Sequence, residues 1–202
     1  EEKADSNLIN YELADKAKNG DKNVFTVKEE KNKVLIKVYS PSKDEEKTFR
    51  FSYVVKNIAV KYKDTGELYY KFLNEGNETP IRKFTVNIKL PYEDKDDRVK
   101  VFAHGPLNGV INKINNIKYQ LKVNNVPAKT FIEGRLLFPT DFIGKSSNYR
   151  DINRYQDVIN EENALQQKKE KDIIRNEKIK KLLNITTLCV SSLSIVVFIA
   201  VL

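Results

Sequence analysis

The last 18 residues of the chain, Ile185 to Leu202, constrain its fold most, because they carry no charged side chain. Ile, Val, Leu and Phe occupy 11 of these 18 positions. A helix of this length reaches roughly 27 Å, close to the hydrocarbon thickness of a bilayer. We therefore predict a transmembrane helix at 185–202 that anchors the residues before it. The alternative is a buried helix of a soluble core, although such cores rarely contain so long an uncharged run.

The chain before this run is polar and basic, with a net charge of +8 over all 202 residues. Residues 1–150 hold 28 basic and 21 acidic residues, so most of the excess lies there. The lysines are spaced along the chain at alternating positions, which favours a solvated outer sheet face over a nucleic-acid surface. The chain contains no Met and begins with Glu1, so we interpret it as a piece of a longer protein. The only cysteine, Cys189, cannot form a disulfide within the chain.

Period-two alternation of apolar and polar residues recurs every 8–12 residues between positions 24 and 138. Aromatic and β-branched residues fill the apolar positions, and turn-forming residues separate the runs. No strand–helix–strand rhythm is present, so the pattern predicts an antiparallel β-sandwich. The expected strands are Val24–Val27, Val34–Tyr39, Thr48–Asn57, Ile58–Tyr62, Leu68–Phe72, Phe84–Leu90, Val99–Ala103, Val110–Ile111, Ile117–Val123 and Phe131–Phe138.

From Ser146 the apolar period changes from two to three and four, which indicates a helix. Ser146–Asn148 can cap its first turn, and apolar residues recur from Ile152 to Leu165. From Gln166 the sequence is almost entirely charged, which is typical of a solvated stalk. We therefore divide the chain into a β-sandwich domain at 1–145, a helix and charged juxtamembrane stalk at 146–184, and the transmembrane helix at 185–202.

The block Tyr62–Pro91 is followed by the motifs His104-Gly105-Pro106-Leu107 and Leu137-Phe138-Pro139. Together they resemble the YciQ-like family of predicted bacterial membrane proteins, which carry the domain of unknown function DUF2207. The resemblance implies an exported domain followed by membrane spans and brings no catalytic residue with it. It extends from about Phe49 to the apolar run, so we expect most of the family's N-terminal portion to be missing from this sequence. Its motifs are Tyr62 with Asp64, Tyr69–Phe72, Thr79-Pro80, Leu90-Pro91, His104-Gly105-Pro106-Leu107 and Leu137-Phe138-Pro139.

Three groups of residues could carry chemistry, and we weighed each against a structural role. His104 is the only histidine, and neither a triad nor a metal cluster accompanies it. Glu93, Asp94, Asp96 and Asp97 lack the spacing of an EF-hand and read as an acidic turn. Alternation places Tyr70 and Phe72 in the core, so that Tyr62, Tyr69, Tyr70 and Phe72 would not form a sugar-stacking platform.

We therefore expect a non-enzymatic domain without catalytic, cofactor or metal sites. The sequence favours an extracytoplasmic, membrane-anchored recognition or assembly module at the bacterial cell envelope, with the membrane bound through Ile185 to Leu202. An envelope protein or glycan is a possible partner, and nucleic acid is not expected. One alternative is a cytoplasm-facing basic module on membrane or nucleic acid, supported by seven basic and three acidic residues at 165–184. A second alternative is an envelope hydrolase, which would need a cleft with clustered carboxylates.

Overall fold

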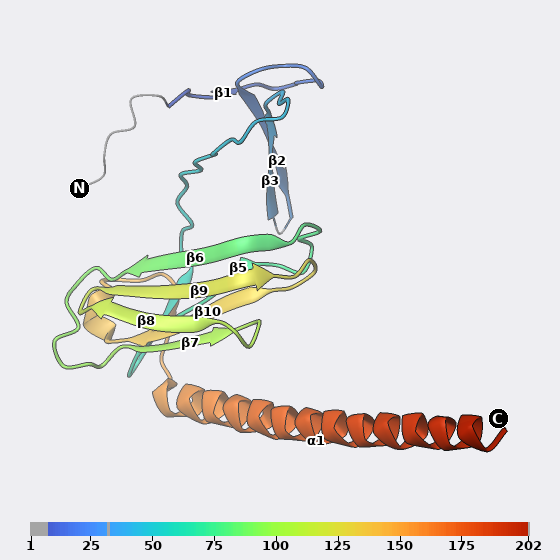
Figure 1. The fold of residues 1–202 in the computed structure, drawn as a ribbon. Helices are drawn as coiled ribbons and strands as arrows, with labels where there is room; N and C mark the ends of the chain where they lie inside the picture. The colour runs from blue at the N-terminus through green and yellow to red at the C-terminus, as the bar shows by residue number, and fades with distance from the viewer. Residues whose placement is uncertain (1–7, 32, 202) are drawn as a thin grey trace. The chain divides into compact units, whose positions relative to one another are not determined.

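A computed structural model describes residues 8–31 and 33–201 of the chain, with side chains described as far as Thr186 (Figure 1). The chain divides into two compact units, residues 1–53 and residues 54–202.

The first unit contains a three-stranded sheet in the order β1-β2-β3. Strands β2 (Val24–Glu30) and β3 (Lys33–Tyr39) pair antiparallel as a hairpin, and β1 (Glu12–Leu13) pairs parallel with β2. The predicted hairpin is therefore confirmed. Its apolar side chains remain largely exposed, as at Val34 (59%) and Leu35 (50%).

The predicted strand at Thr48–Asn57 is wrong, because no strand forms between residues 48 and 57. Its expected inward residues are exposed, with Phe51 at 54% and Tyr53 at 69%. The segment leads from the first unit into the second, and among the described residues no neighbouring strand pairs with its backbone. Alternation alone does not make a strand, since the backbone N–H and C=O groups also need a ladder partner.

The second unit contains a five-stranded sheet in the order β11-β4-β5-β10-β7 and a three-stranded sheet in the order β6-β9-β8. All pairs are antiparallel except that between β11 and β4. The chain is therefore mainly β, with mixed sheets rather than purely antiparallel ones. The elements are β4 (Ala59–Tyr62), β5 (Gly66–Leu73), β6 (Ile81–Lys89), β7 (Lys100–His104), β8 (Val110–Asn115), β9 (Lys118–Val126), β10 (Ile132–Phe138), the short helix η1 (Thr140–Phe142), β11 (Tyr149–Arg150) and α1 (Tyr155–Val201).

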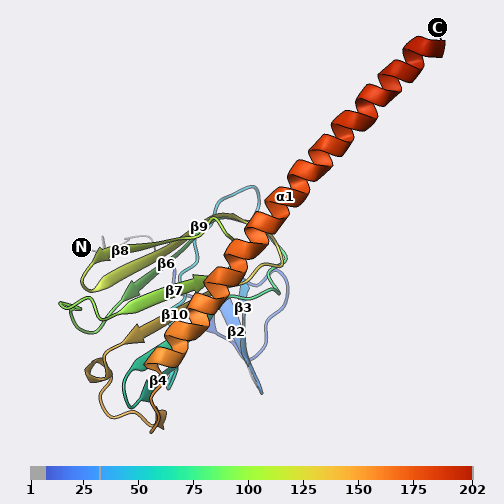
Figure 2. The same ribbon diagram turned by 90° about the horizontal axis from the view of Figure 1, so that it is seen from below.

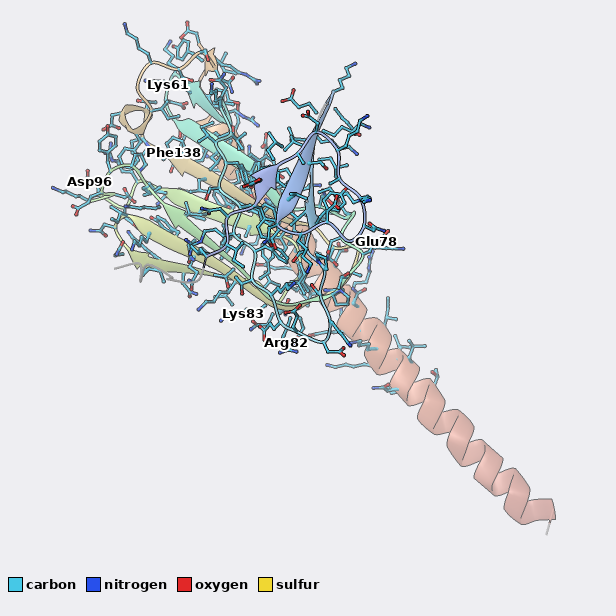
Figure 3. All side chains as sticks on the ribbon, turned by 90° about the horizontal axis from the view of Figure 1, so that it is seen from above. Lys61, Glu78, Arg82, Lys83, Asp96 and Phe138 are labelled. Carbon is cyan, nitrogen blue, oxygen red and sulfur yellow. The ribbon has the colours of Figure 1, made fainter. Side chains whose placement is uncertain are left out.

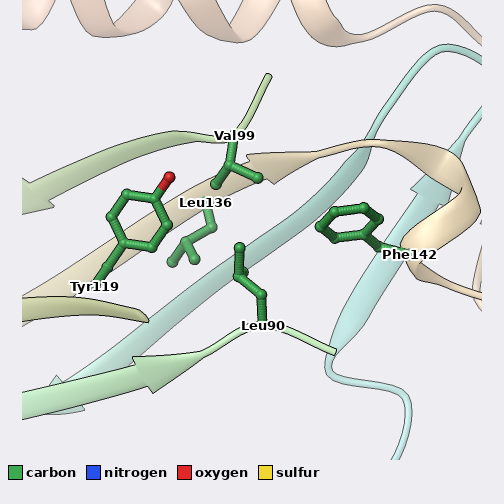
Figure 4. Packing of buried hydrophobic residues seen from close by; sticks show 5 residues of the cluster. All are labelled: Leu90, Val99, Tyr119, Leu136 and Phe142. Carbon is green, nitrogen blue, oxygen red and sulfur yellow. The ribbon is translucent and has the colours of Figure 1, made fainter. Parts of the chain in front are cut away.

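The hydrophobic core lies between these two sheets and consists of two clusters. The larger cluster joins Leu136 of β10 to Tyr119 of β9, together with Leu90, Val99 and Phe142 (Figure 4). The smaller one comprises Val123, Val126 and Ile132. Because each cluster draws residues from both sheets, the sheets pack face to face. The predicted alternation of β6 is confirmed, since Phe84, Val86 and Ile88 are less exposed than the polar residues between them.

Helix α1 begins at Tyr155, seven residues after the predicted cap at Ser146–Asn148, which is therefore wrong. The backbone at Tyr149–Arg150 instead pairs with the edge strand β4 as β11, so it is not available for a helical turn. Ile152, which the pattern placed in the helix, is 54% exposed in the connection.

Beyond the first turns of α1, no described side chain between Gln166 and Thr186 is buried, as expected for a solvated stalk. Within the part of the chain that the structure describes, no helix has a stretch long and apolar enough to cross a membrane. Of the predicted span at 185–202, all but the first two residues lie outside the residues with described side chains.

Candidate functional site

The outer face of the five-stranded sheet carries a buried arginine. On β10, Leu136 points into the core, so alternation places its neighbours Arg135 and Leu137 on the opposite face. Both are nonetheless buried, with Arg135 at 4% and Leu137 at 0% exposure. An element must therefore cover this face of the sheet, and Figure 2 shows α1 crossing β7 and β10 there.

The guanidinium of Arg135 joins the sheet to α1. Its Nε donates a hydrogen bond to Oε1 of Glu67 on β5, at 2.6 Å. Its Nη1 donates to Oε2 of Glu161 at 2.9 Å and to Oε1 of Glu162 at 3.0 Å, both on α1. Glu67 and Glu162 are 6% and 5% exposed, so the strongest contacts lie out of water. One side chain thus holds two strands and the helix together.

Two further groups line this contact. Nη2 of Arg154 lies 2.8 Å from Oε1 of Glu161, in a more exposed pair. Nε2 of His104 lies 3.2 Å from Oε2 of Glu162, a contact that is not a hydrogen bond. We call the six residues together the helix-docking cluster: Glu67, His104, Arg135, Arg154, Glu161 and Glu162.

The electrostatics of the cluster favour the charged forms of Arg135 and Glu161. Burial lowers the pKa of Arg135, but hydrogen bonds to Glu162 and Glu161 outweigh burial and leave this pKa above its usual value. Burial likewise raises the pKa of Glu161, but the hydrogen bonds from Arg135 and Arg154 outweigh burial and hold this pKa below its usual value. The Tyr69 ring lies 5.2 Å from the Arg135 guanidinium, at cation–π distance. Burial, and then the hydrogen bond to Glu133, raise the pKa of Tyr69 to about 12.

The arrangement is suited to holding the helix in place rather than to turnover. The Glu67 and Glu161 carboxylates accept hydrogen bonds from arginine, and Glu162 does so while also facing His104. A buried carboxylate that is bound to a guanidinium is screened from a substrate, whereas a general acid needs access to one. The contact between the helix and the sheet is the chemistry that this geometry supports.

A residue from the loop before β5 caps the first turn of α1. Oδ1 of Asp64 accepts a hydrogen bond from the backbone N–H of Arg154 at 2.8 Å, and Oδ2 accepts one from that of Tyr155 at 3.2 Å. These N–H groups have no partner within the helix, and a carboxylate there also complements the helix dipole. Asp64 therefore fixes where the helix starts.

Replacing Asp64 by Ala should remove this cap and lower the free energy of unfolding by about 1 kcal/mol. For a chain of this size the thermal midpoint should fall by about 2–4 °C. The matched control is Asp64→Asn, which keeps an acceptor oxygen and should change the midpoint less. Equal midpoints for wild type and Asp64→Ala, measured by thermal circular dichroism, would contradict the capping role.

Each residue considered for chemistry from the sequence has a definite place. His104 faces Glu162 of the helix. Asp94 is 1% exposed, and its carboxylate accepts hydrogen bonds from the backbone of Arg98 and Val99. It thus organises the acidic turn, and no cluster of three or more metal-ligating side chains occurs among the described residues.

The aromatic residues of β5 follow the predicted alternation. Tyr69 is 49% exposed, whereas Tyr70 and Phe72 are partly buried. The rings of Tyr70 and Phe72 pack edge to face, with their centroids 5.2 Å apart. Tyr62 is buried, at 5% exposure. The four aromatic residues therefore do not share one exposed surface.

Sequence reasoning missed the centre of the helix-docking cluster. Arg135 directly precedes Leu136, Leu137 and Phe138 in β10, and Glu67 precedes Leu68 and two tyrosines in β5. A charged residue next to an apolar run was the available signal. Three of the motifs quoted above nevertheless meet at this contact. Asp64 caps the helix, His104 faces Glu162, and Leu137 is buried beside Arg135.

A comparison with models of known protein families gives a match. A family model described as "Predicted membrane protein (DUF2207) N-terminal domain" matches residues 5–138. No match was found among curated proteins or among solved structures. The matched residues include the three strands that supply the cluster, β5, β7 and β10, and end at Phe138, the last residue of β10.

Proposed function

Since this chain belongs to the family of predicted membrane proteins defined by the DUF2207 N-terminal domain, we propose that it is a membrane-anchored module at the bacterial cell envelope. In this proposal the β-sheet domain lies outside the cytoplasm and recognises, or assembles with, an envelope component. It carries out no catalysis itself. The observation that carries the proposal is the helix-docking cluster, because a domain fixed to its anchor helix presents its surfaces in a defined direction.

The anchor is supported by the continuity of α1. One helix, Tyr155–Val201, contains both the docked turns and the uncharged run that begins at Ile185. The solvated stretch from Gln166 to Ile185 would hold the domain about 30 Å from the start of that run. The uncharged run has the length and composition of a bilayer span.

The orientation rests on two opposing arguments. The seven basic residues between 165 and 184 favour a cytoplasmic position for the domain by the positive-inside rule. Long segments, however, translocate largely regardless of their charge, and a preceding signal would fix the orientation first. The family resemblance also favours an exported domain. We therefore place the domain outside the cytoplasm.

Labelling with a membrane-impermeant thiol reagent tests this orientation. In the intact protein expressed in cells, Lys145→Cys places an exposed thiol at the edge of the domain. The reagent should label this cysteine in whole cells as fully as after lysis. The parent protein, whose only thiol within these residues is Cys189, is the control for background labelling. Labelling of Lys145→Cys only after lysis would place the domain in the cytoplasm and favour the basic-module alternative.

A further inference from the structure

The three-stranded sheet of the second unit, β6-β9-β8, carries only basic charges, whereas the five-stranded sheet carries charges of both signs. Strands β6, β8 and β9 contain six basic residues and no acidic residue. In the five-stranded sheet, by contrast, Glu67 and Glu133 stand near Arg135 and Lys71. The six basic residues are Arg82, Lys83, Lys89, Lys113, Lys118 and Lys122.

Four of these lysines lie on one surface, the outer face of the sheet. Phe84 and Ile88 point inward on β6, so Lys83 and Lys89 point outward by alternation. Tyr119 and Leu121 point inward on β9, which places Lys118 and Lys122 on the same outer face. Figure 3 shows Lys83 beside Arg82 at the start of β6. We call Lys83, Lys89, Lys118 and Lys122 the basic face. The four lysines are spread along the sequence and come together only because β6 pairs with β9.

Among the described residues, the basic face has no paired carboxylate. Lys89 and Lys118 are directly opposite in the β6–β9 register, an arrangement in which like charges destabilise a sheet. None of the four lysines has an ion pair within 4.0 Å in the described part of the chain. Lys71 and Lys113, in contrast, are each paired with a carboxylate. The unfavourable repulsion is relieved when an anion from outside the chain binds.

Amide side chains occupy the centre of this face. Gln120 lies opposite both Asn87 on β6 and Asn112 on β8. Its Nε2 donates a hydrogen bond to Oδ1 of Asn87 at 2.7 Å. The remaining amide groups can donate to and accept from hydroxyl groups. No outward position of these three strands carries an aromatic residue, so the face has no platform on which bases could stack.

The spacing of the charges suits a linear ligand. Lys118 and Lys122 are four residues apart on one strand, and Lys83 and Lys89 are six residues apart on the next. At 3.2–3.4 Å per residue these separations are about 13 Å and 20 Å. On each strand two lysines are separated by a segment that contains an amide side chain, Asn87 on β6 and Gln120 on β9. This pattern matches a linear ligand in which phosphate groups alternate with hydroxyl-bearing units.

We propose that the basic face binds a linear polyol phosphodiester of the cell envelope. This assignment rests on the proposed function only in placing the domain outside the cytoplasm, where such a ligand occurs. The basic face belongs to the sheet opposite the one that holds α1, so it is not turned towards the helix (Figure 2). A face held beside a stalk of about 30 Å is suited to a polymer in solution rather than to lipid headgroups.

Fluorescence anisotropy with labelled poly(glycerol phosphate) tests this proposal on the whole chain in a non-ionic detergent. Binding should weaken with salt, with a slope of log affinity against log salt of about −3 if four phosphates are neutralised. Lys89→Gln with Lys118→Gln should weaken binding about tenfold and reduce the slope by about 1.4. The matched control, Lys168→Gln with Lys171→Gln, removes the same charge from exposed positions of α1 and should leave binding unchanged.

A second readout requires no ligand. Because the Lys89→Gln, Lys118→Gln variant removes a like-charge pair, its thermal midpoint should not fall. Three results would overturn the proposal: absence of binding, equal weakening in both double variants, or tighter binding of duplex DNA or of phosphatidylglycerol in mixed micelles. If the polymer binds as expected but the Lys145→Cys label shows a cytoplasmic domain, the proposed function fails and the binding face stands.

Discussion

Replacing Arg135 by Met should destabilise the folded second unit by about 3–5 kcal/mol, because it leaves buried carboxylates without their cation. Glu67 and Glu162 are 6% and 5% exposed, and Arg135 donates a hydrogen bond to each of them. For a chain of this size the thermal midpoint should fall by about 6–20 °C. The measurement is thermal unfolding by circular dichroism at neutral pH.

Arg154 provides the matched control. Its side chain is 26% exposed and its partner Glu161 is 44% exposed, so Arg154→Met should cost about 0–1 kcal/mol. Adding Glu67→Leu and Glu162→Leu to Arg135→Met removes the stranded charges and should recover part of the loss. Equal midpoints for Arg135→Met and Arg154→Met would show that the buried pairs do not hold the helix to the sheet.

The strands were predictable from the sequence where one face meets the core. Phe84, Val86 and Ile88 alternate with polar residues, and β6 forms there with the predicted face inward. The sequence could not show which strands become neighbours, because hydrogen-bonded pairing is set by the whole sheet. The basic face depends on such pairing, since β6 and β9 are separated by 28 residues of chain.

The errors in the prediction have a shared cause. The segment at 48–57 has strand periodicity but no ladder partner among the described residues, and the predicted cap at Ser146–Asn148 gave way to pairing of β11 with β4. In both places the tertiary partner decided the outcome. The start of α1 is likewise set by Asp64, which lies 90 residues away in sequence from Arg154. Local patterns do not contain these contacts.

Replacing Val158 by Asp should release α1 from the sheet and leave the two core clusters intact. Val158 is completely buried, and with Glu162 it is one of two buried residues of α1 among the described side chains. A carboxylate at this position would lose its solvation one helical turn from the carboxylate of Glu162, at a cost of several kcal/mol. Neither core cluster includes a residue of α1. We therefore expect the helix to leave the sheet before the two core clusters unfold.

Hydrogen–deuterium exchange separates this local release from global unfolding. In Val158→Asp, exchange should accelerate in residues 156–166 while the amides of β9 and β10 keep their protection. Asn160→Asp is the matched control, since it adds the same charge at an exposed position of the same turn and should leave exchange unchanged. Loss of protection in β9 together with the helix would show that docking and the sheets form one cooperative unit. If only the helix is released, poly(glycerol phosphate) should still bind, because the basic face lies on the other sheet. The helix-docking cluster would then control the orientation of the domain relative to α1 rather than its affinity for the polymer.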